Sequence, residues 1–187
     1  MLVSEARAAA AAWVADHASR EPAFLGAHFT GSTVDMAADA ELPVASDVDV
    51  AVVLDVDEAP AKAGKFLHRG ALVEVTYVPW HETREALGDY HLAGGLRTDT
   101  VIADPSGRLR PLQALVAKHF SDEKWVRFRC EQAAQRVETR LRAIDGTAPW
   151  HQQVMGWVFP TGVTTHVLLV AARRNPTVAS ATWRPAP

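Results

Sequence analysis

Two aspartates, a glycine–serine pair and one glutamate have the types and spacing of a centre that binds phosphate and metal. Asp47 and Asp49 open an apolar, β-branched run that predicts a strand. Residues two apart on a strand point to the same face, so the two carboxylates project together. Neighbouring carboxylates repel each other unless a cation lies between them, and Mg²⁺ prefers carboxylate oxygens together with substrate phosphates. Asp47 and Asp49 are therefore candidate ligands of a divalent metal.

Gly31, Ser32 and Glu74 supply the remaining groups that such a centre needs. Gly31 allows a phosphate to approach the backbone closely, and Ser32 offers a hydroxyl donor. Glu74 lies in an otherwise apolar strand predicted over 71–78, where a carboxylate is costly to bury unless it meets a metal or a partner. Each feature alone has another interpretation: an exposed acidic strand edge, an ordinary turn, or a glutamate that faces water.

The elements that must position these residues follow from the apolar periodicity. The pattern predicts a helix over 3–17, strands over 23–30, 46–55 and 71–78, a short helix over 81–87 and a small strand at 101–102. From residue 109 onward the period becomes helical, and a late apolar stretch over 154–172 is interrupted by Pro160 and Gly162. Two apolar helical faces are expected there, the first with Leu112, Leu115, Val116 and His119 and the second with Phe128, Ala133 or Ala134, Val137 and Leu141. The fold class is α/β (α+β): a small, mixed, twisted sheet with flanking helices over 1–108, followed by a helical region over 109–187.

These motifs together resemble a known superfamily. The pair Gly31-Ser32, the segment Ser46-Asp47-Val48-Asp49 that leads an apolar strand, and Glu74 in a later strand are similar to the nucleotidyltransferase superfamily of DNA polymerase β. The similarity is greatest to the small-molecule branch, which includes aminoglycoside nucleotidyltransferases. It covers residues 23–78 and extends weakly through the turn at 104–107 and the helices that follow.

The resemblance implies an enzyme that performs two-metal nucleotidyl transfer. A hydroxyl of a small acceptor, such as an aminoglycoside-like compound, would attack the α-phosphate of a nucleoside triphosphate, with AMP from ATP as the expected group. Asp47, Asp49 and Glu74 are then the catalytic residues that hold two Mg²⁺ ions, and Gly31 and Ser32 position the β- and γ-phosphates. Glu74 is either the third metal ligand or the base for the attacking hydroxyl. Arg127, Arg129 or Arg136 of the helical half could contact phosphate, and Trp80 could stack on a sugar or base ring. Antibiotic resistance is the biological role that this acceptor would suggest.

Composition and charge limit the partners and the compartment. The formal net charge is −3, which argues against long nucleic acid as a partner, although residues 1–60 carry −9 and residues 61–187 carry +6. The single cysteine, Cys130, cannot form an internal disulfide. The alanine run at 8–12 lacks a basic region before it, and the apolar stretch over 163–172 is too short to cross a bilayer. A cytoplasmic protein with no membrane partner is expected.

Three other interpretations remain open. The chain could be a nucleotidyltransferase that modifies protein or RNA, as toxin–antitoxin members of the same superfamily do. It could be a module that binds a nucleotide without turnover, or an interaction domain that binds no nucleotide. The apolar stretch over 163–172 has little left to pack against, so either further helices are missing at the C-terminus or this stretch packs in a homo-oligomer.

Overall fold

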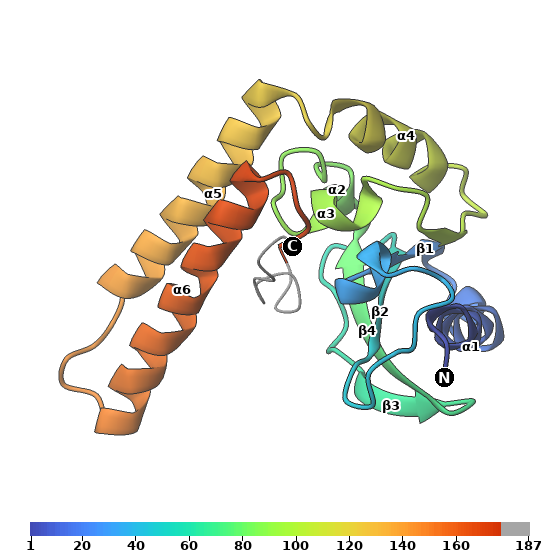
Figure 1. Cartoon of the computed structure of the whole chain (residues 1–187), viewed down its shortest axis with the longest axis horizontal. Helices are drawn as coiled ribbons and strands as arrows, with labels where there is room; N and C mark the ends of the chain where they lie inside the picture. The colour runs from blue at the N-terminus through green and yellow to red at the C-terminus, as the bar shows by residue number, and fades with distance from the viewer. Residues whose placement is uncertain (177–187) are drawn as a thin grey trace.

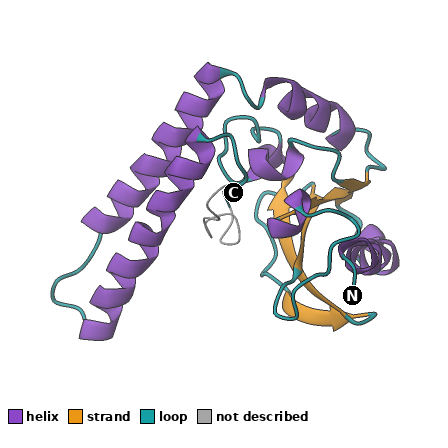
Figure 2. Cartoon of the chain, in the orientation of Figure 1, coloured by secondary structure: helices purple, strands orange, loops and turns teal. Residues whose placement is uncertain are grey.

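A five-stranded mixed sheet forms the first half of the molecule. The computed structural model describes residues 1–176, and the strand order is β3-β4-β2-β1-β5 (Figures 1 and 2). The strands are β1 (Phe24–Thr30), β2 (Val48–Leu54), β3 (Gly64–His68), β4 (Ala71–Pro79) and β5 (Val101–Ala103). The β2–β4 pair is parallel, whereas β1–β2, β3–β4 and β1–β5 are antiparallel. The mixed α/β class expected from the sequence is confirmed.

Helices cover both faces of the sheet. They are α1 (Val3–Asp16), α2 (Trp80–Thr83), α3 (Leu92–Leu96), α4 (Leu109–His119), α5 (Glu123–Arg142) and α6 (Trp150–Ala171), with 3-10 turns η1 (Ala18–Arg20) and η2 (Ser32–Asp35). Helix α1 packs on one face, where its buried alanines meet Val48, Val50 and Val52 of β2. Helices α3 and α4 approach the other face, at Gly26 and His28 of β1.

The alternation along β2 and β4 decides which side chains reach which face. The residues that meet the α1 layer are valines at every second position, among them Val73 and Val75 of β4. Asp49 and Glu74 alternate with these valines and so lie on the face away from α1. The acidic side chains are therefore kept out of the apolar cluster that packs against α1.

Strand β3 is the element that the periodicity did not predict. Its residues alternate between partly buried and exposed, with Phe66 toward the core and Leu67 75% exposed, so it is a short edge strand with little apolar signal. It pairs with β4 through a tight turn at Arg69 and Gly70, both of which have positive φ. Such two-residue turns match the twist of a hairpin, and a glycine in the second position is their usual sequence mark.

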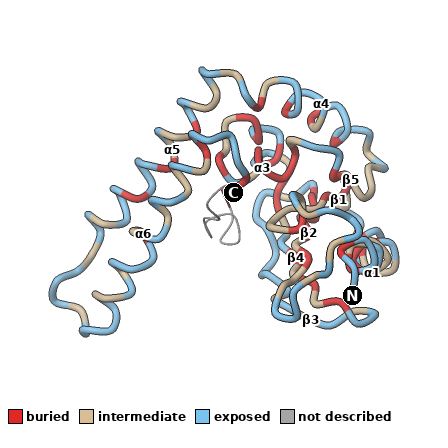
Figure 3. The backbone as a smooth tube through the Cα atoms, viewed as in Figure 1, coloured by how far each residue is buried: buried red, intermediate tan, exposed pale blue. Residues whose placement is uncertain are grey.

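Helices α5 and α6 form an antiparallel hairpin that projects from the rest of the molecule (Figure 1). Contrary to the expectation from the sequence, Pro160 does not interrupt the late apolar stretch, because α6 runs through it as one helix of 22 residues. This helix is long and apolar enough to cross a membrane by length and composition alone, with a mean hydropathy of 1.5 over its most apolar 18 residues. The stretch over 163–172, expected to be too short for this, is part of that longer helix. Only 11% of its apolar window is buried (Figure 3).

The helical faces predicted in the second half are confirmed in part. Leu112 and Val116 of α4 and Ala133 and Val137 of α5 are buried as expected. Leu115 and Phe128, expected on those faces, are 47% and 51% exposed. The buried face of α5 contains Arg129 instead. Its guanidinium donates hydrogen bonds to the carbonyls of Leu87 (2.9 Å) and Phe120, and it stacks over the Phe120 ring.

We expect Arg129→Met to lower the free energy of unfolding by about 2–4 kcal/mol, because it leaves two buried carbonyl groups without donors. Urea denaturation measures the effect. The matched control is Arg127→Met, since Arg127 is exposed on the same helix and forms an exposed ion pair with Glu123, and its change should stay within about 0.5 kcal/mol. Equal losses in both variants would contradict a structural role for the buried guanidinium.

Candidate functional site

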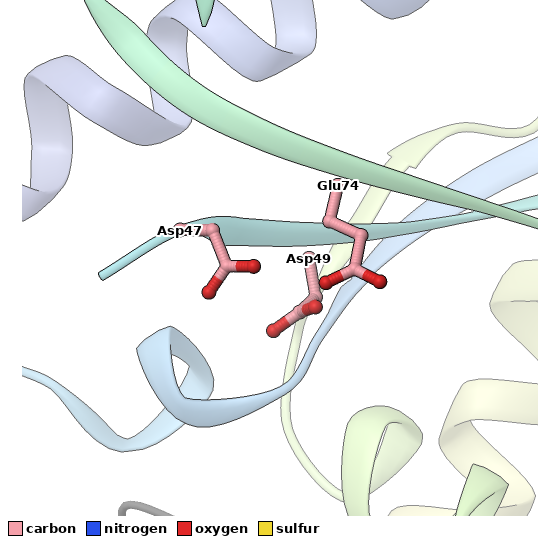
Figure 4. A group of neighbouring side chains, drawn as sticks. All are labelled: Asp47, Asp49 and Glu74. Carbon is pink, nitrogen blue, oxygen red and sulfur yellow. The ribbon is translucent and has the colours of Figure 1, made fainter. Parts of the chain in front are cut away.

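Three carboxylates meet at the start of β2 and the first half of β4. Asp49 of β2 and Glu74 of β4 are register partners in the parallel pair, and Asp47 precedes β2 by one residue. One oxygen of each side chain lies within 4.8 Å of the others (Figure 4). Three half-buried carboxylates at this separation form a set of hard oxygen ligands suited to Mg²⁺. The structure therefore brings together all three acidic residues that the sequence singled out.

Gly31 lies directly against this cluster. It follows β1, whose last residue Thr30 pairs with Asp49, and its backbone has φ 70° and ψ −159°, a region that essentially only glycine occupies. A Cβ at this position would overlap the Asp49 carboxylate. The glycine is thus required both by the backbone conformation and by the space that Asp49 fills. Ser32 begins the 3-10 turn η2 immediately after it, so both predicted phosphate-binding residues border the carboxylates.

Two arginines fix the turn η2 from outside. Arg7 of α1 donates to the carbonyls of Thr33 and Met36, and Arg97 forms an ion pair with Asp35. The loop that carries Gly31 and Ser32 is consequently tied to α1 on one side and to the end of α3 on the other. A loop held in this way keeps its backbone groups in place before any ligand binds.

Asn175 reaches the same loop from the end of the helical hairpin. Its side-chain amide donates a hydrogen bond of 2.8 Å to the carbonyl of Gly31, and the residue is 3% exposed. Its amide oxygen packs against Gly94 so closely that a Cβ there would overlap it. No pattern in the sequence indicates this contact, since Asn175 lies 144 residues from Gly31 and in no apolar repeat. The helical half is therefore connected to the candidate site.

Two lysines provide positive charge at the carboxylates. Lys65 of β3 forms ion pairs with Asp47 (2.6 Å) and Glu74 (3.4 Å), and Lys62 forms one with Glu74. Lys65 is the register partner of Glu74 in the β3–β4 hairpin, so its position depends on the strand that the sequence did not predict. Arg127, Arg129 and Arg136, considered from the sequence as contacts for phosphate, lie instead on α5 in ion-pair, buried or aromatic contacts.

The pKa values show that the lysines stabilise the charge of Asp47 more than that of Asp49. Burial, together with the nearby charges of Asp47 and Glu74, raises the pKa of Asp49 to about 7. Partial burial opposes ionisation of Asp47 as well, yet its hydrogen bond and ion pair with Lys65 hold the pKa of Asp47 below its ordinary value. The same pairing raises the pKa of the Lys65 ammonium. Because the lysines pair with Asp47 and Glu74, the negative charge of Asp49 is left uncompensated, and an added cation would be stabilised beside it.

Trp80, which the sequence suggested as a stacking surface for a sugar or base, has a different environment. It begins α2 and packs against the apolar cluster of α3 and α4, with the Arg108 guanidinium 5.6 Å from its ring centroid. Its ring is thus engaged by other parts of the protein, which favours a packing role.

A scan against protein-family models gives no match for this chain, and a search of curated proteins gives none. The case for a function therefore depends on the residues and their geometry.

We expect Gly31→Ala to lower the thermal stability and to displace Asp49, because alanine is strained at this backbone conformation and its Cβ overlaps the carboxylate. The cost should be about 2–4 kcal/mol, from strain of about 1–3 kcal/mol together with the clash. Gly107→Ala is the control, since Gly107 also has positive φ (69°) but has nothing within 4 Å of the added Cβ. Similar losses in the two variants would show that backbone strain alone accounts for the effect.

The raised pKa of Asp49 predicts a pH dependence of stability in metal-free buffer. The folded-state pKa of about 7 lies above the ordinary value of 3.8, so the folded protein binds the extra proton and its stability falls as the pH rises from about 4 to about 7. Asp49→Asn should remove this loss and raise the stability above pH 7 by about 1–3 kcal/mol, after allowance for partial exposure.

Urea denaturation across this pH range measures the effect as the difference between wild type and variant. The difference is needed because two buried histidines act in the opposite sense. Burial lowers the pKa values of His28 and His91 to about 4, so their contribution makes the protein less stable as the pH falls below about 6.5. A difference that stays constant from pH 4 to pH 8 would contradict the electrostatic cost assigned to Asp49.

Proposed function

We propose that this chain is a Mg²⁺-dependent nucleotidyltransferase that moves a nucleoside monophosphate, AMP from ATP, onto a hydroxyl of a small acceptor. The observation that carries the proposal is the meeting of Asp47, Asp49 and Glu74 across the parallel β2–β4 pair, with the Gly31–Ser32 loop against Asp49. The resemblance to the nucleotidyltransferase superfamily of DNA polymerase β depends on these same residues.

The chemistry of the cluster supports a metal in it. Asp47, Asp49 and Glu74 would hold the two Mg²⁺ ions, whose charge stabilises the attacking and leaving oxygens in phosphoryl chemistry. Three neighbouring carboxylates are costly to keep ionised together, and the burial of Asp49 adds to that cost. Divalent cations would offset both the repulsion among the carboxylates and the cost of burying the Asp49 charge. This explains why a protein would hold these groups so close.

The loop residues and the lysines would bind the triphosphate. Gly31 presents backbone without a Cβ, and Ser32 a hydroxyl, at the edge of the carboxylates, where the β- and γ-phosphates would lie. Lys62 and Lys65 are about half exposed on long, flexible side chains, so they can leave the carboxylates when a metal replaces them. They would then lie beside the phosphates. Glu74 serves as a third metal ligand or as the base that accepts the proton of the attacking hydroxyl.

The acceptor that we propose is a small hydroxyl-bearing molecule of the aminoglycoside class, as in the branch that the chain resembles most. A protein of this kind would act in the cytoplasm, where ATP and Mg²⁺ are available, and its role would be antibiotic resistance. Screening of acceptors follows naturally from a positive nucleotide-binding result.

Thermal unfolding with and without Mg²⁺-ATP tests the proposal. Ligand at about 100-fold over its dissociation constant should add about 2.7 kcal/mol, a rise in Tm of roughly 5–10 °C for a chain of this size. The double variant Asp47→Asn/Asp49→Asn should lose this rise, because it removes two of the three ligands. Absence of a rise in the wild type would contradict the proposal.

The chain offers a matched control for this double variant. Asp55 and Asp57 have the same spacing, follow the other end of β2 and are exposed, so Asp55→Asn/Asp57→Asn should keep the full rise in Tm. Release of pyrophosphate in the presence of an aminoglycoside panel then separates an enzyme from a module that only binds the nucleotide. Binding without pyrophosphate release on any acceptor would favour the module.

A further inference from the structure

Helix α6 is covered on one side only. Its 22 residues, Trp150–Ala171, contain no aspartate, glutamate, lysine or arginine and are apolar around the whole circumference. The other long helix of the hairpin, α5, packs along one face through Ala133 and Val137, and only Pro160 and Val170 of α6 are buried. A helix that is apolar all round is normally buried on all sides. Residues 1–176 therefore provide no second surface that covers this helix.

The uncovered side carries a regular stripe. We define the α6 stripe as the residues that recur at alternating intervals of four and three along the helix: Trp150, Val154, Trp157, Thr161, Thr164 and Leu168. At 3.6 residues per turn these positions lie along one line of the helix surface. None of them is buried, and Trp150, Trp157 and Leu168 are 77%, 60% and 71% exposed. Alternation of four and three is the spacing of helices that pack against another helix.

A lipid bilayer is a poor partner for this stripe, although α6 has the length to span one. The chain leaves the sheet region into α5 and returns to it after α6, where Asn175 binds the Gly31 carbonyl. If α6 crossed a membrane, α5 would have to cross beside it. Helix α5 contains five arginines, one lysine and three glutamates, and each charged side chain at the centre of a bilayer is costly.

A second copy of the same chain fits the stripe in spacing and in size. The intervals read the same in both directions, so two stripes crossing antiparallel about a two-fold axis place Trp150 opposite Leu168 and Trp157 opposite Thr161. Each large ring then faces a smaller side chain, which lets the two surfaces interlock. The stripe carries no charge, so self-association requires no complementary charge on a partner.

The exposed apolar area of the α6 stripe supplies a large part of what a stable dimer needs. The apolar side chains of the stripe that remain exposed amount to on the order of 400–500 Å² per chain, most of it from Trp150, Trp157 and Leu168. That is comparable with the largest apolar patch of a typical monomer and about half of the roughly 800 Å² per partner of a specific complex. Polar residues beside the stripe, including Thr165, would supply part of the rest.

We propose that the chain forms a homodimer through the α6 stripe, with the two α6 helices antiparallel about a two-fold axis near residue 159. The pair of hairpins then makes a four-helix arrangement with both α6 helices inside and the charged α5 helices outside. Asn175 lies shortly after the end of α6 at Ala171, so the interface is close in the chain to the segment that contacts the Gly31 loop.

Sedimentation equilibrium of the full chain tests the dimer without reference to any activity. At about 10 µM the wild type should have twice the 20.3 kDa mass of the chain. Trp157→Glu should raise the dissociation constant of the dimer by at least about 30-fold, because it places a charge in the centre of the stripe. Phe159→Glu is the control, since Phe159 is equally exposed (61%) on the same helix but points away from the stripe. Far-ultraviolet circular dichroism checks that both variants are folded.

Cysteine cross-linking tests the register. In a Cys130→Ser background, a mixture of Trp157→Cys and Thr161→Cys chains should form the mixed disulfide dimer faster than either chain alone forms its own. A monomeric wild type at this concentration, a dimer that Phe159→Glu breaks and Trp157→Glu does not, or binding of the monomer to vesicles of anionic and zwitterionic lipid would each overturn the proposal. Because none of these measurements involves Mg²⁺ or nucleotide, their outcome is separate from that of the proposed function.

Discussion

The repulsion among three carboxylates is the constraint on which the rest of the candidate site depends. Parallel pairing of β2 with β4 places Asp49 beside Glu74, and Asp47 completes the group within 4.8 Å. No apolar core tolerates such a group without compensation, so every neighbouring feature adjusts to it. The valines that alternate with these acids along both strands pack against α1, so the opposite, acidic face is available to polar partners.

The lysines compensate the negative charge of the three carboxylates only in part. Lys65 and Lys62 balance Asp47 and Glu74, while Asp49 retains a pKa near 7 because burial and its acidic neighbours both oppose its charge. Gly31 leaves room for the Asp49 carboxylate and keeps the following loop close to it. A site that already contains flexible cations and still favours more positive charge is suited to exchange its lysines for metal ions, as the proposed function requires.

The second half of the molecule exposes a large apolar surface on α6. Helix α5 is highly charged and α6 contains no charged residue, so their hairpin satisfies only one side of α6. The hairpin is nevertheless tied to the half of the molecule that contains the sheet, and Asn175 carries that connection to the Gly31 loop. The segment that ends with Asn175 thus connects α6 with the loop of the candidate site.

The sequence by itself determined the features that depend on local patterning. Alternation placed β2 and β4 and put Asp49 and Glu74 on one face, and residue type alone marked Gly31, Ser32 and the three acids. Tertiary structure decided what depends on pairing over long distances. Edge strand β3 has a weak pattern because one of its sides faces water, so the position of Lys65 could be known only from its pairing with Glu74. Asn175 meets Gly31 only after the whole chain has folded, and α6 continues through Pro160 because packing against α5 outweighs the lost hydrogen bond.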